Sequence, residues 1–218
     1  AQLGKDAYDC IVPLSGGKDS TFTLLYCVRD LHLRPLAVTF DHGFFRSVVL
    51  ENRRRALDIL GVDWLSFKPS WGMVKKTMRE GLERKGDFCW HCHSGVFAYP
   101  MQVAAEKGIK LVIWGEPSAE YSAYYDYKGI EKVNETRFNL VANLGITASD
   151  MAGMVKEPQG RLGWAKYPTP SRLQGVQSIC LGSYIPWDVK SQVKRIKEEL
   201  GWEEDGAEGV PPEYGYEK

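Results

Sequence analysis

The sequence predicts an α/β fold: a Rossmann-like parallel sheet of about five strands with helices on both faces. Short apolar runs alternate with longer amphipathic segments, a pattern that is typical of repeated strand–helix–strand units. The first apolar run ends directly in a glycine turn that opens a helix. The chain has 218 residues, 44% of them hydrophobic, which is enough to bury the core of such a domain.

Each expected strand is a short apolar run, and each expected helix repeats apolar residues at helical spacing. Tyr8–Leu14 (YDCIVPL) is the first strand, and Ser20–Leu31 follows its glycine turn as a helix. Leu36–Phe40 (LAVTF) is the second buried strand. The next helix, Val48–Leu60, ends before Gly61, because glycine is a common C-terminal stop.

The same criteria continue the alternation through the rest of the chain. They predict strands at Asp63–Phe67, Lys110–Trp114 and Ser178–Leu181, and helices at Trp71–Arg84, Val96–Lys107 and Val189–Leu200. Between the last two strands the pattern is weaker, with one helical stretch near Glu131–Asn143. We therefore expect one domain over residues 1–218, with an insertion at 117–172 that covers the substrate.

Charge and composition exclude several classes of protein. Lys and Arg total 28 and Asp and Glu total 28, so the chain lacks the basic excess of a dedicated nucleic-acid binder. We find no apolar run of 18 residues and no signal-peptide pattern, so no membrane partner is expected. An odd count of five cysteines without a secretory signal indicates a reducing, cytoplasmic location. The oligomeric state stays open.

The candidate ligand-binding residues directly follow the strands, because parallel sheets bind ligands at the carboxyl ends of their strands. Ser15–Ser20 (SGGKDS) joins the first strand to the first helix. Its glycines allow an oxyanion to approach, Lys18 adds a positive charge, and Ser15 and Ser20 add hydroxyl donors. The spacing is neither Walker A nor the dinucleotide G-x-G-x-x-G. The alternative is an ordinary strand–helix turn in which Ser20 caps the helix.

SGGKDS resembles the pyrophosphate-binding loop of the PP-loop, or N-type, ATP pyrophosphatases, which have an adenine nucleotide α-hydrolase-like fold. Such enzymes cleave ATP between its α and β phosphates and adenylate a carbonyl-type oxygen, so that a nitrogen or sulfur nucleophile can displace AMP. The resemblance implies ATP and Mg²⁺ as cofactors. It implies that the loop residues Ser15, Gly16, Gly17, Lys18 and Ser20 bind the leaving pyrophosphate, and that Asp19 either holds Mg²⁺ indirectly or caps backbone donors. It also implies that Asp41 and Gly115 contact the nucleotide, and that Lys18, Asp19 and Glu116 are catalytic.

A narrower resemblance covers most of the chain. The segments YDCIVPLSGGKDST, VTFDHGF, DFCWHCHSGVFAYPMQVA, IWGEPSAEY, NLGITASDMAGM and CLGSYIPWDVK resemble the N-acetyl sugar amidotransferases of surface-polysaccharide (lipopolysaccharide O-antigen) biosynthesis. This implies a nucleotide-linked amino sugar as substrate and a separate glutaminase subunit that supplies ammonia. Family members carry a cysteine-bearing segment before this domain and a stretch after it, and the chain lacks an initiator Met, so a fragment of a longer protein is expected.

The segment WGEPSAEY and the tyrosines after it are candidates for substrate contacts. Glu116 or Glu120 is expected to act as a base toward ammonium or to stabilise the amidinium product. Tyr121 and Tyr124 suit a sugar ring or a nucleoside base, because each offers an aromatic face and a hydroxyl. The alternatives are solvated or capping carboxylates, and tyrosines that pack the insertion onto the domain.

Three cysteines are candidate metal ligands. Cys89 and Cys92 have metal-ligand spacing at the start of a helix, a position that is expected to lower their thiol pKa. Cys180, at the fifth strand, is expected to approach Cys92. Three thiolates favour a [4Fe–4S] cluster with an open iron, as in PP-loop tRNA thiolases, and Zn²⁺ with His91 or His93 is the competitor. Two idle, partly buried thiols at Cys89 and Cys92 are the remaining alternative.

Two other functions remain open. One is a tRNA-modifying, thiolase-like enzyme in which the CxxC motif carries sulfur or a cluster. The other is a non-catalytic ATP-binding regulator. We also expect Arg53, Arg54 and Arg55 to form a solvated helix face, and Trp187 and Asp188 to lie on the ligand side of the sheet.

Overall fold

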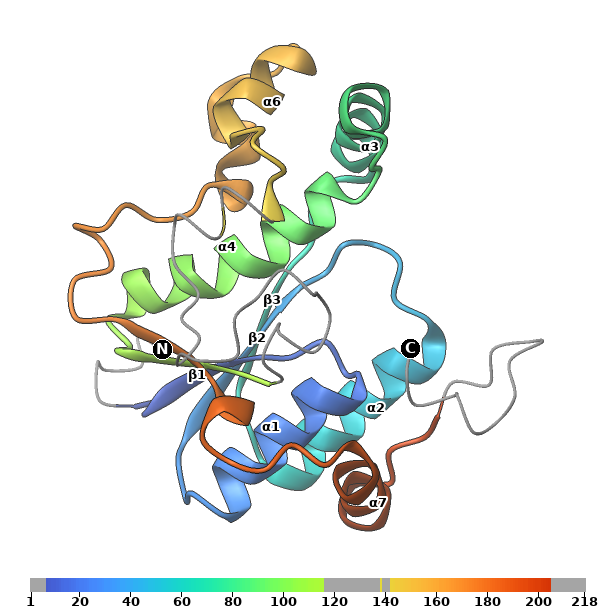
Figure 1. Cartoon of the computed structure of the whole chain (residues 1–218), viewed down its shortest axis with the longest axis vertical. Helices are drawn as coiled ribbons and strands as arrows, with labels where there is room; N and C mark the ends of the chain where they lie inside the picture. The colour runs from blue at the N-terminus through green and yellow to red at the C-terminus, as the bar shows by residue number, and fades with distance from the viewer. Residues whose placement is uncertain (1–6, 116–137, 139–141, 205–218) are drawn as a thin grey trace.

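A parallel sheet forms the centre of the computed structural model, which describes residues 7–115, 138 and 142–204 (Figure 1). Its strands follow the order β3-β2-β1-β4-β5, and every neighbouring pair is parallel. The strands are β1 (Cys10–Pro13), β2 (Pro35–Phe40), β3 (Trp64–Phe67), β4 (Leu111–Trp114) and β5 (Gln177–Cys180). The predicted fold class, a five-stranded parallel α/β sheet, is confirmed.

The strand order creates a switch point beside β1. The chain runs outward from β1 through β2 to β3, and then returns across the sheet to place β4 on the other side of β1. Connections therefore leave the carboxyl ends of β1 and β4 in opposite directions, which opens a crevice between them. β1 and β2 are buried along almost their whole length, because helices cover both faces of the sheet.

The helices form one layer on each face of the sheet, and α3 and α6 lie beyond the layer that contains α4 (Figure 1). One face carries α1 (Lys18–Arg29), α2 (Ser47–Leu60) and α7 (Val189–Leu200), and the other carries α4 (Trp90–Lys107). The other elements are α3 (Trp71–Lys85), α6 (Ala148–Met154) and the 3-10 segments Gln159–Ala165 and Leu181–Ser183. No helix among the described residues has the length and apolar character needed to cross a membrane.

Strand periodicity divides the core between the two layers. Cys10 and Val12 of β1 pack on the α1 side with Cys27, while Ile11 packs on the α4 side with Met101. Alternate residues of a strand point to opposite faces, so a short apolar run serves both layers. All five predicted strands are found, and their observed bounds differ from the predicted ones by no more than two residues at either end.

Two helices begin two or more residues earlier than predicted, and α2 begins one residue earlier, at Ser47. α1 begins at Lys18 and not at Ser20, and α4 begins at Trp90 and not at Val96. The start of α4 is anchored by tertiary contacts: Trp90 is fully buried, and its indole Nε1 donates to the Ile146 carbonyl over 3.0 Å. α6, with a capping box between Thr147 and Asp150, packs near this start and was not predicted as a helix.

Candidate functional site

A cavity of about 360 Å³ lies at the carboxyl ends of β1, β2 and β4. Four residues of the SGGKDS loop (residues 15–20) form one wall of this cavity, namely Ser15, Gly17, Asp19 and Ser20, while Gly16 and Lys18 do not line it. The residues at the end of β2 form a second wall. The N-terminal half of α4 and the ends of β4 and β5 complete it. The cavity is thus at the switch point of the sheet, where open α/β folds bind their ligands.

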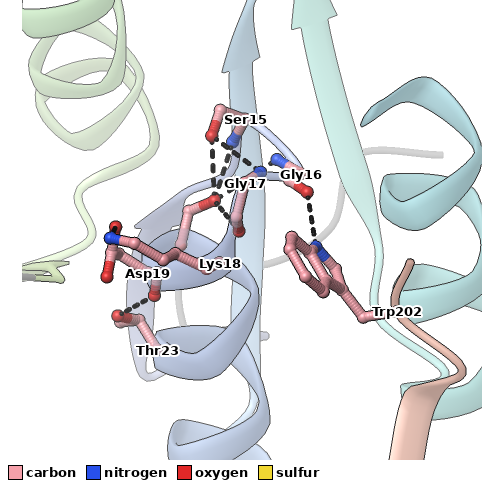
Figure 2. Close-up of polar contacts among 8 residues, drawn as sticks. Ser15, Gly16, Gly17, Lys18, Asp19, Thr23 and Trp202 are labelled. Carbon is pink, nitrogen blue, oxygen red and sulfur yellow. Dashed lines mark hydrogen bonds and ion pairs between the residues drawn. The ribbon is translucent and has the colours of Figure 1, made fainter. Parts of the chain in front are cut away.

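Inside the SGGKDS loop, backbone N–H groups and hydroxyls converge (Figure 2). The Ser20 Oγ accepts from the N–H groups of Ser15 (3.2 Å) and Gly16 (3.3 Å), and it lies 3.0 Å from the Ser15 Oγ. The N–H of Gly17 donates to the Ser15 Oγ over 3.2 Å. Successive N–H groups that point inward make an anion-binding concavity. Because Gly17 is the residue before α1, Ser20 is not the helix cap and organises the loop instead.

Two glycines are required by close approach of the backbone. Gly16 has a φ of +100°, and a Cβ on it would lie 2.4 Å from the Val49 carbonyl oxygen. Gly115, at the end of β4, would place a Cβ 3.0 Å from the Thr23 Oγ1 and 3.3 Å from the Asp19 Cβ. Gly115 therefore lets β4 approach the start of α1, and it lies on the cavity wall as the predicted nucleotide contact requires.

Lys18 and Asp19 form an ion pair at the start of α1. The Lys18 Nζ lies 2.6 Å from the Asp19 Oδ2, and the two side chains are 13% and 18% exposed. The Asp19 Oδ1 is buried and has no hydrogen-bond partner among the described residues. An unsatisfied buried carboxylate oxygen is costly, and oxygen is the ligand that Mg²⁺ prefers. This oxygen is available to Mg²⁺, which is one of the two roles expected for Asp19, and Mg²⁺ binding stays a prediction.

Asp41 follows β2 as predicted, but its carboxylate does not line the cavity. It accepts from the Gly43 N–H over 2.8 Å and lies 3.1 Å from the exposed Lys68 Nζ. The adjacent His42 and Phe45 line the cavity instead. Burial lowers the pKa of His42 below its ordinary value, against the opposing effect of Asp41, which favours the neutral form of its ring. Nucleotide contact by Asp41 stays a prediction.

Arg53 departs from the expected solvated helix face. Its side chain is buried, with its guanidinium 4.8 Å from the Phe45 ring centroid and 5.1 Å from that of Trp64. Burial lowers the pKa of Arg53 from its ordinary value. Consecutive helix residues point about 100° apart, so one of three arginines can face inward while Arg54 stays exposed and pairs with Glu51 and Asp58.

Two residues behind the loop were missed by the sequence analysis. The Arg53 NH1 donates to the Ser15 carbonyl over 3.4 Å, and the Trp202 Nε1 donates to the Gly16 carbonyl over 3.1 Å. Neither contact has a local sequence signal, because Arg53 lies on α2 and Trp202 follows α7. The one hint in the sequence was a large aromatic residue, Trp202, shortly after the helix predicted over Val189–Leu200.

Two of the three candidate metal ligands share the cavity wall. Cys92, on α4, and Cys180, at the end of β5, both line the cavity, while Cys89 precedes α4 and does not. Among the described residues, no group of three His, Cys, Asp or Glu side chains is close enough to hold a metal ion. These residues therefore do not form a ready three-cysteine site, and cluster or Zn²⁺ binding stays a prediction.

The expected lowering of the thiol pKa at this helix start is wrong. Burial raises the pKa of Cys92 to about 12, and it also raises the pKa of Cys89 above its ordinary value, with Asp87 adding to both effects. The helix dipole favours thiolates at an exposed helix start, but here desolvation is the larger effect. His91, a proposed zinc partner, is fully buried, and its Nε2 lies 3.3 Å from the His42 carbonyl oxygen.

The remaining candidates divide into two groups. Glu116, Glu120, Tyr121 and Tyr124 lie outside the described residues. Trp187 and Asp188, expected on the ligand side of the sheet, do not line the cavity and make packing and helix-capping contacts instead. The Trp187 ring packs edge-on against Phe22 at 5.7 Å, and Asp188 caps α7 by accepting from the N–H groups of the helix start.

Comparison with known proteins gives distant likenesses. No protein-family model matches the chain. A U34-tRNA thiolase of Methanococcus maripaludis, solved with its [4Fe–4S] cluster, superposes with a TM-score of 0.48 at 12% identity, over 97% of this chain and 64% of the thiolase. NMN synthetase of Francisella tularensis superposes with a TM-score of 0.44 at 12% identity, over 89% of this chain and 79% of the synthetase. The uncharacterized protein MJ1599 of Methanocaldococcus jannaschii is 24% identical over 157 residues, which are 67% of this chain and 56% of MJ1599. The chain thus spans about half the length of this curated relative.

Proposed function

We propose that the chain is an ATP-dependent amidotransferase that converts the N-acetyl group of a nucleotide-linked amino sugar into an acetamidino group. One observation carries the ATP-dependent part: the N–H groups of the SGGKDS loop converge on the Ser15 and Ser20 hydroxyls, and these two residues line a cavity at the switch point, beside the Lys18–Asp19 pair. The sugar substrate is supported by the resemblance of the motifs along the chain.

The chemistry explains why such a site needs an anion-binding loop. An amide oxygen is a very poor leaving group, so ammonia does not displace it directly. When that oxygen attacks the α-phosphorus of ATP, pyrophosphate leaves and the oxygen becomes part of a bound AMP. Ammonia then adds to the activated carbon, AMP departs with the oxygen, and loss of a proton leaves the amidine.

The residues of the chain supply the charge for the first step. Negative charge develops on the departing pyrophosphate, and N–H groups, hydroxyls and an ammonium placed beside it stabilise that charge. In this structure the SGGKDS loop offers all three kinds of donor, with Lys18 as the ammonium. Asp19 would hold Mg²⁺, which neutralises phosphate charge when it is bound.

The apolar part of the cavity serves the second step. Phe97 and Trp114 pack together at 5.3 Å between ring centroids, and both line the cavity. Such walls exclude water, which would otherwise hydrolyse the adenylated intermediate. We place the enzyme in the cytoplasm. We also propose that a separate glutaminase supplies the ammonia, because none of the chain's motifs supplies a glutaminase nucleophile.

A second candidate function shares the adenylation step. Cys92 and Cys180 line the same cavity as the SGGKDS loop, and that placement favours a thiolase-like enzyme in which a sulfur donor supplies the nucleophile that displaces AMP. Its substrate would be a tRNA base. The balance of 28 basic and 28 acidic residues weighs against it, because tRNA binding depends on basic surface.

One experiment separates these functions. The purified protein is incubated with ATP, Mg²⁺ and ammonium, and with either nucleotide-linked N-acetyl sugars or bulk tRNA plus sulfide. The proposal expects AMP, pyrophosphate and a sugar product in which O is replaced by NH, detected by mass spectrometry. Sulfur incorporation into tRNA would support the thiolase. ATP binding with no AMP formed from either substrate would indicate a regulator and contradict both enzymes.

A further inference from the structure

Trp202 contacts the SGGKDS loop from the side opposite to Lys18 and Asp19 (Figure 2). Its indole Nε1 donates to the carbonyl oxygen of Gly16 over 3.1 Å, and this hydrogen bond is buried. Neither Trp202 nor Gly16 is part of the cavity wall. Trp202 therefore acts on the loop without contacting what the cavity binds.

This hydrogen bond determines where a neighbouring N–H group points. In a trans peptide unit, the carbonyl and the following N–H point in opposite directions, and the described residues contain no cis peptide bond. With its carbonyl directed at Trp202, the Gly16–Gly17 unit turns the Gly17 N–H away from the indole. That N–H reaches the Ser15 Oγ, on the cavity wall, over 3.2 Å.

Arg53 does the same for the preceding peptide unit. It donates to the Ser15 carbonyl over 3.4 Å, and the Gly16 N–H at the other end of that unit reaches the Ser20 Oγ over 3.3 Å. Two successive carbonyls are therefore held behind the loop, and two successive N–H groups are directed to its front. This is the arrangement that an anion site requires.

The Gly16–Gly17 unit is the part of the loop that most needs such a restraint. Glycine has no Cβ, so a peptide unit between two glycines rotates with little steric resistance. After rotation, the Gly16 carbonyl oxygen would point toward the cavity and repel a phosphate. The Trp202 hydrogen bond opposes that rotation because it is lost when the unit turns.

Trp202 lies in a short segment, Gly201–Glu204, which we call the latch and which is bound to α2 through Glu203. Gly201 ends α7 with a φ of +62°, which turns the chain toward α2. There the Asn52 side chain bonds both backbone groups of Glu203, its Nδ2 donating to the carbonyl (2.8 Å) and its Oδ1 accepting from the N–H (2.9 Å). The Trp202 ring is buried in the cluster formed by α1, α2 and α7.

We propose that Trp202 is a positioning residue, and that the latch holds the Gly16–Gly17 peptide in its anion-binding orientation. This inference rests on the proposed function, since it assumes that the loop binds pyrophosphate or the phosphates of ATP. It adds a residue far from the motif in sequence, and it gives the segment after α7 a role in binding.

The test removes one N–H group and keeps the ring. Trp202→Phe deletes the donor to Gly16, and Trp187→Phe is the matched control, because the buried Trp187 Nε1 has no hydrogen-bond partner among the described residues. Trp202→Phe is expected to weaken pyrophosphate binding about tenfold in titration calorimetry, as loss of one buried hydrogen bond predicts. Trp187→Phe should bind like the wild type. Asn52→Ala, which loosens the latch without touching Trp202, should weaken binding in the same direction.

A second readout does not need the ligand. In spectra of protein labelled with ¹⁵N-glycine, the Gly17 amide signal should shift or broaden in Trp202→Phe and stay unchanged in Trp187→Phe. If both variants bind pyrophosphate like the wild type and the Gly17 signal does not move, the latch is refuted. If the wild type binds neither pyrophosphate nor ATP, the proposed function fails, and the Gly17 signal still decides whether Trp202 orients the peptide.

Discussion

Lys18 forms an ion pair with Asp19 at the start of α1, and Asp19 lines the cavity. Lys18→Ala is expected to lower the rate of AMP release by about 100-fold or more, because a charge that stabilises the leaving pyrophosphate is removed. The fold should persist, since Lys18 is not part of a hydrophobic cluster. Pyrophosphate release and urea unfolding measure the two effects.

Lys76→Ala is the control for that variant, because Lys76 is exposed and pairs with Glu157, and neither residue lines the cavity. It should release AMP at nearly the wild-type rate. Near-normal turnover in Lys18→Ala would show that the loop does not bind the leaving pyrophosphate.

A substitution at Gly16 tests the backbone of the same loop. Gly16→Ala combines a φ of +100° with a Cβ 2.4 Å from the Val49 carbonyl oxygen, so it should lower the free energy of unfolding by about 3 kcal/mol. Gly61→Ala also has a positive φ, but +63° lies in the left-handed helical region and nothing lies within 4 Å of the Cβ position, so it should cost about 1 kcal/mol. Equal losses in urea titrations of the two variants would mean that neither the contact with Val49 nor the larger φ of Gly16 carries energy.

Packing between elements depends on a glycine in α4. A Cβ on Gly95 would lie 2.2 Å from the Phe40 ring, so Gly95 is what allows α4 to approach β2. Gly95→Ala should therefore overpack this contact and lower the free energy of unfolding by about 2 kcal/mol. Because Phe40 lines the cavity, the displaced ring should also weaken ATP binding, which titration calorimetry would detect.

Gly72→Ala, in α3, is the matched helix substitution, since nothing lies within 4 Å of its Cβ position. It should raise the free energy of unfolding by about 0.5 kcal/mol, because alanine has the higher helix propensity. A Gly95→Ala protein as stable as the Gly72→Ala protein would contradict the close approach of α4 to β2.

Ligand binding should stabilise the molecule as a whole. At a ligand concentration of about 100 times Kd, ATP with Mg²⁺ should raise the free energy of unfolding by about 2.7 kcal/mol. Asp19 supplies a buried carboxylate oxygen without a hydrogen-bond partner among the described residues, so Asp19→Asn should reduce the part of this stabilisation that depends on Mg²⁺. Thermal unfolding with ATP, with and without EDTA, measures it. An unchanged Mg²⁺ effect in Asp19→Asn would exclude Asp19 as a ligand.

Much of the fold could be predicted from local patterns. The five strands, the helices that cover them and the place of the SGGKDS loop after β1 follow from periodicity and from one glycine turn. Arg53 and the start of α4 could not be predicted this way. A run of three arginines does not reveal which member faces the sheet, and the helix start at Trp90 depends on a contact with Ile146.

The sequence by itself determined the parallel α/β sheet and the position of the SGGKDS loop between β1 and α1, because these depend on neighbours along the chain. The tertiary structure alone decided that Cys92 and Cys180 share the cavity with that loop, that Asp41 turns aside to Gly43 and Lys68, and that Trp202 holds the Gly16 carbonyl. Each of these contacts joins segments that meet only when the helices pack on the sheet, or a side chain whose direction is set by competing hydrogen bonds. Burial then changes the chemistry as well, as the raised pKa of Cys92 illustrates, because desolvation depends on the packed surroundings and not on the residue type.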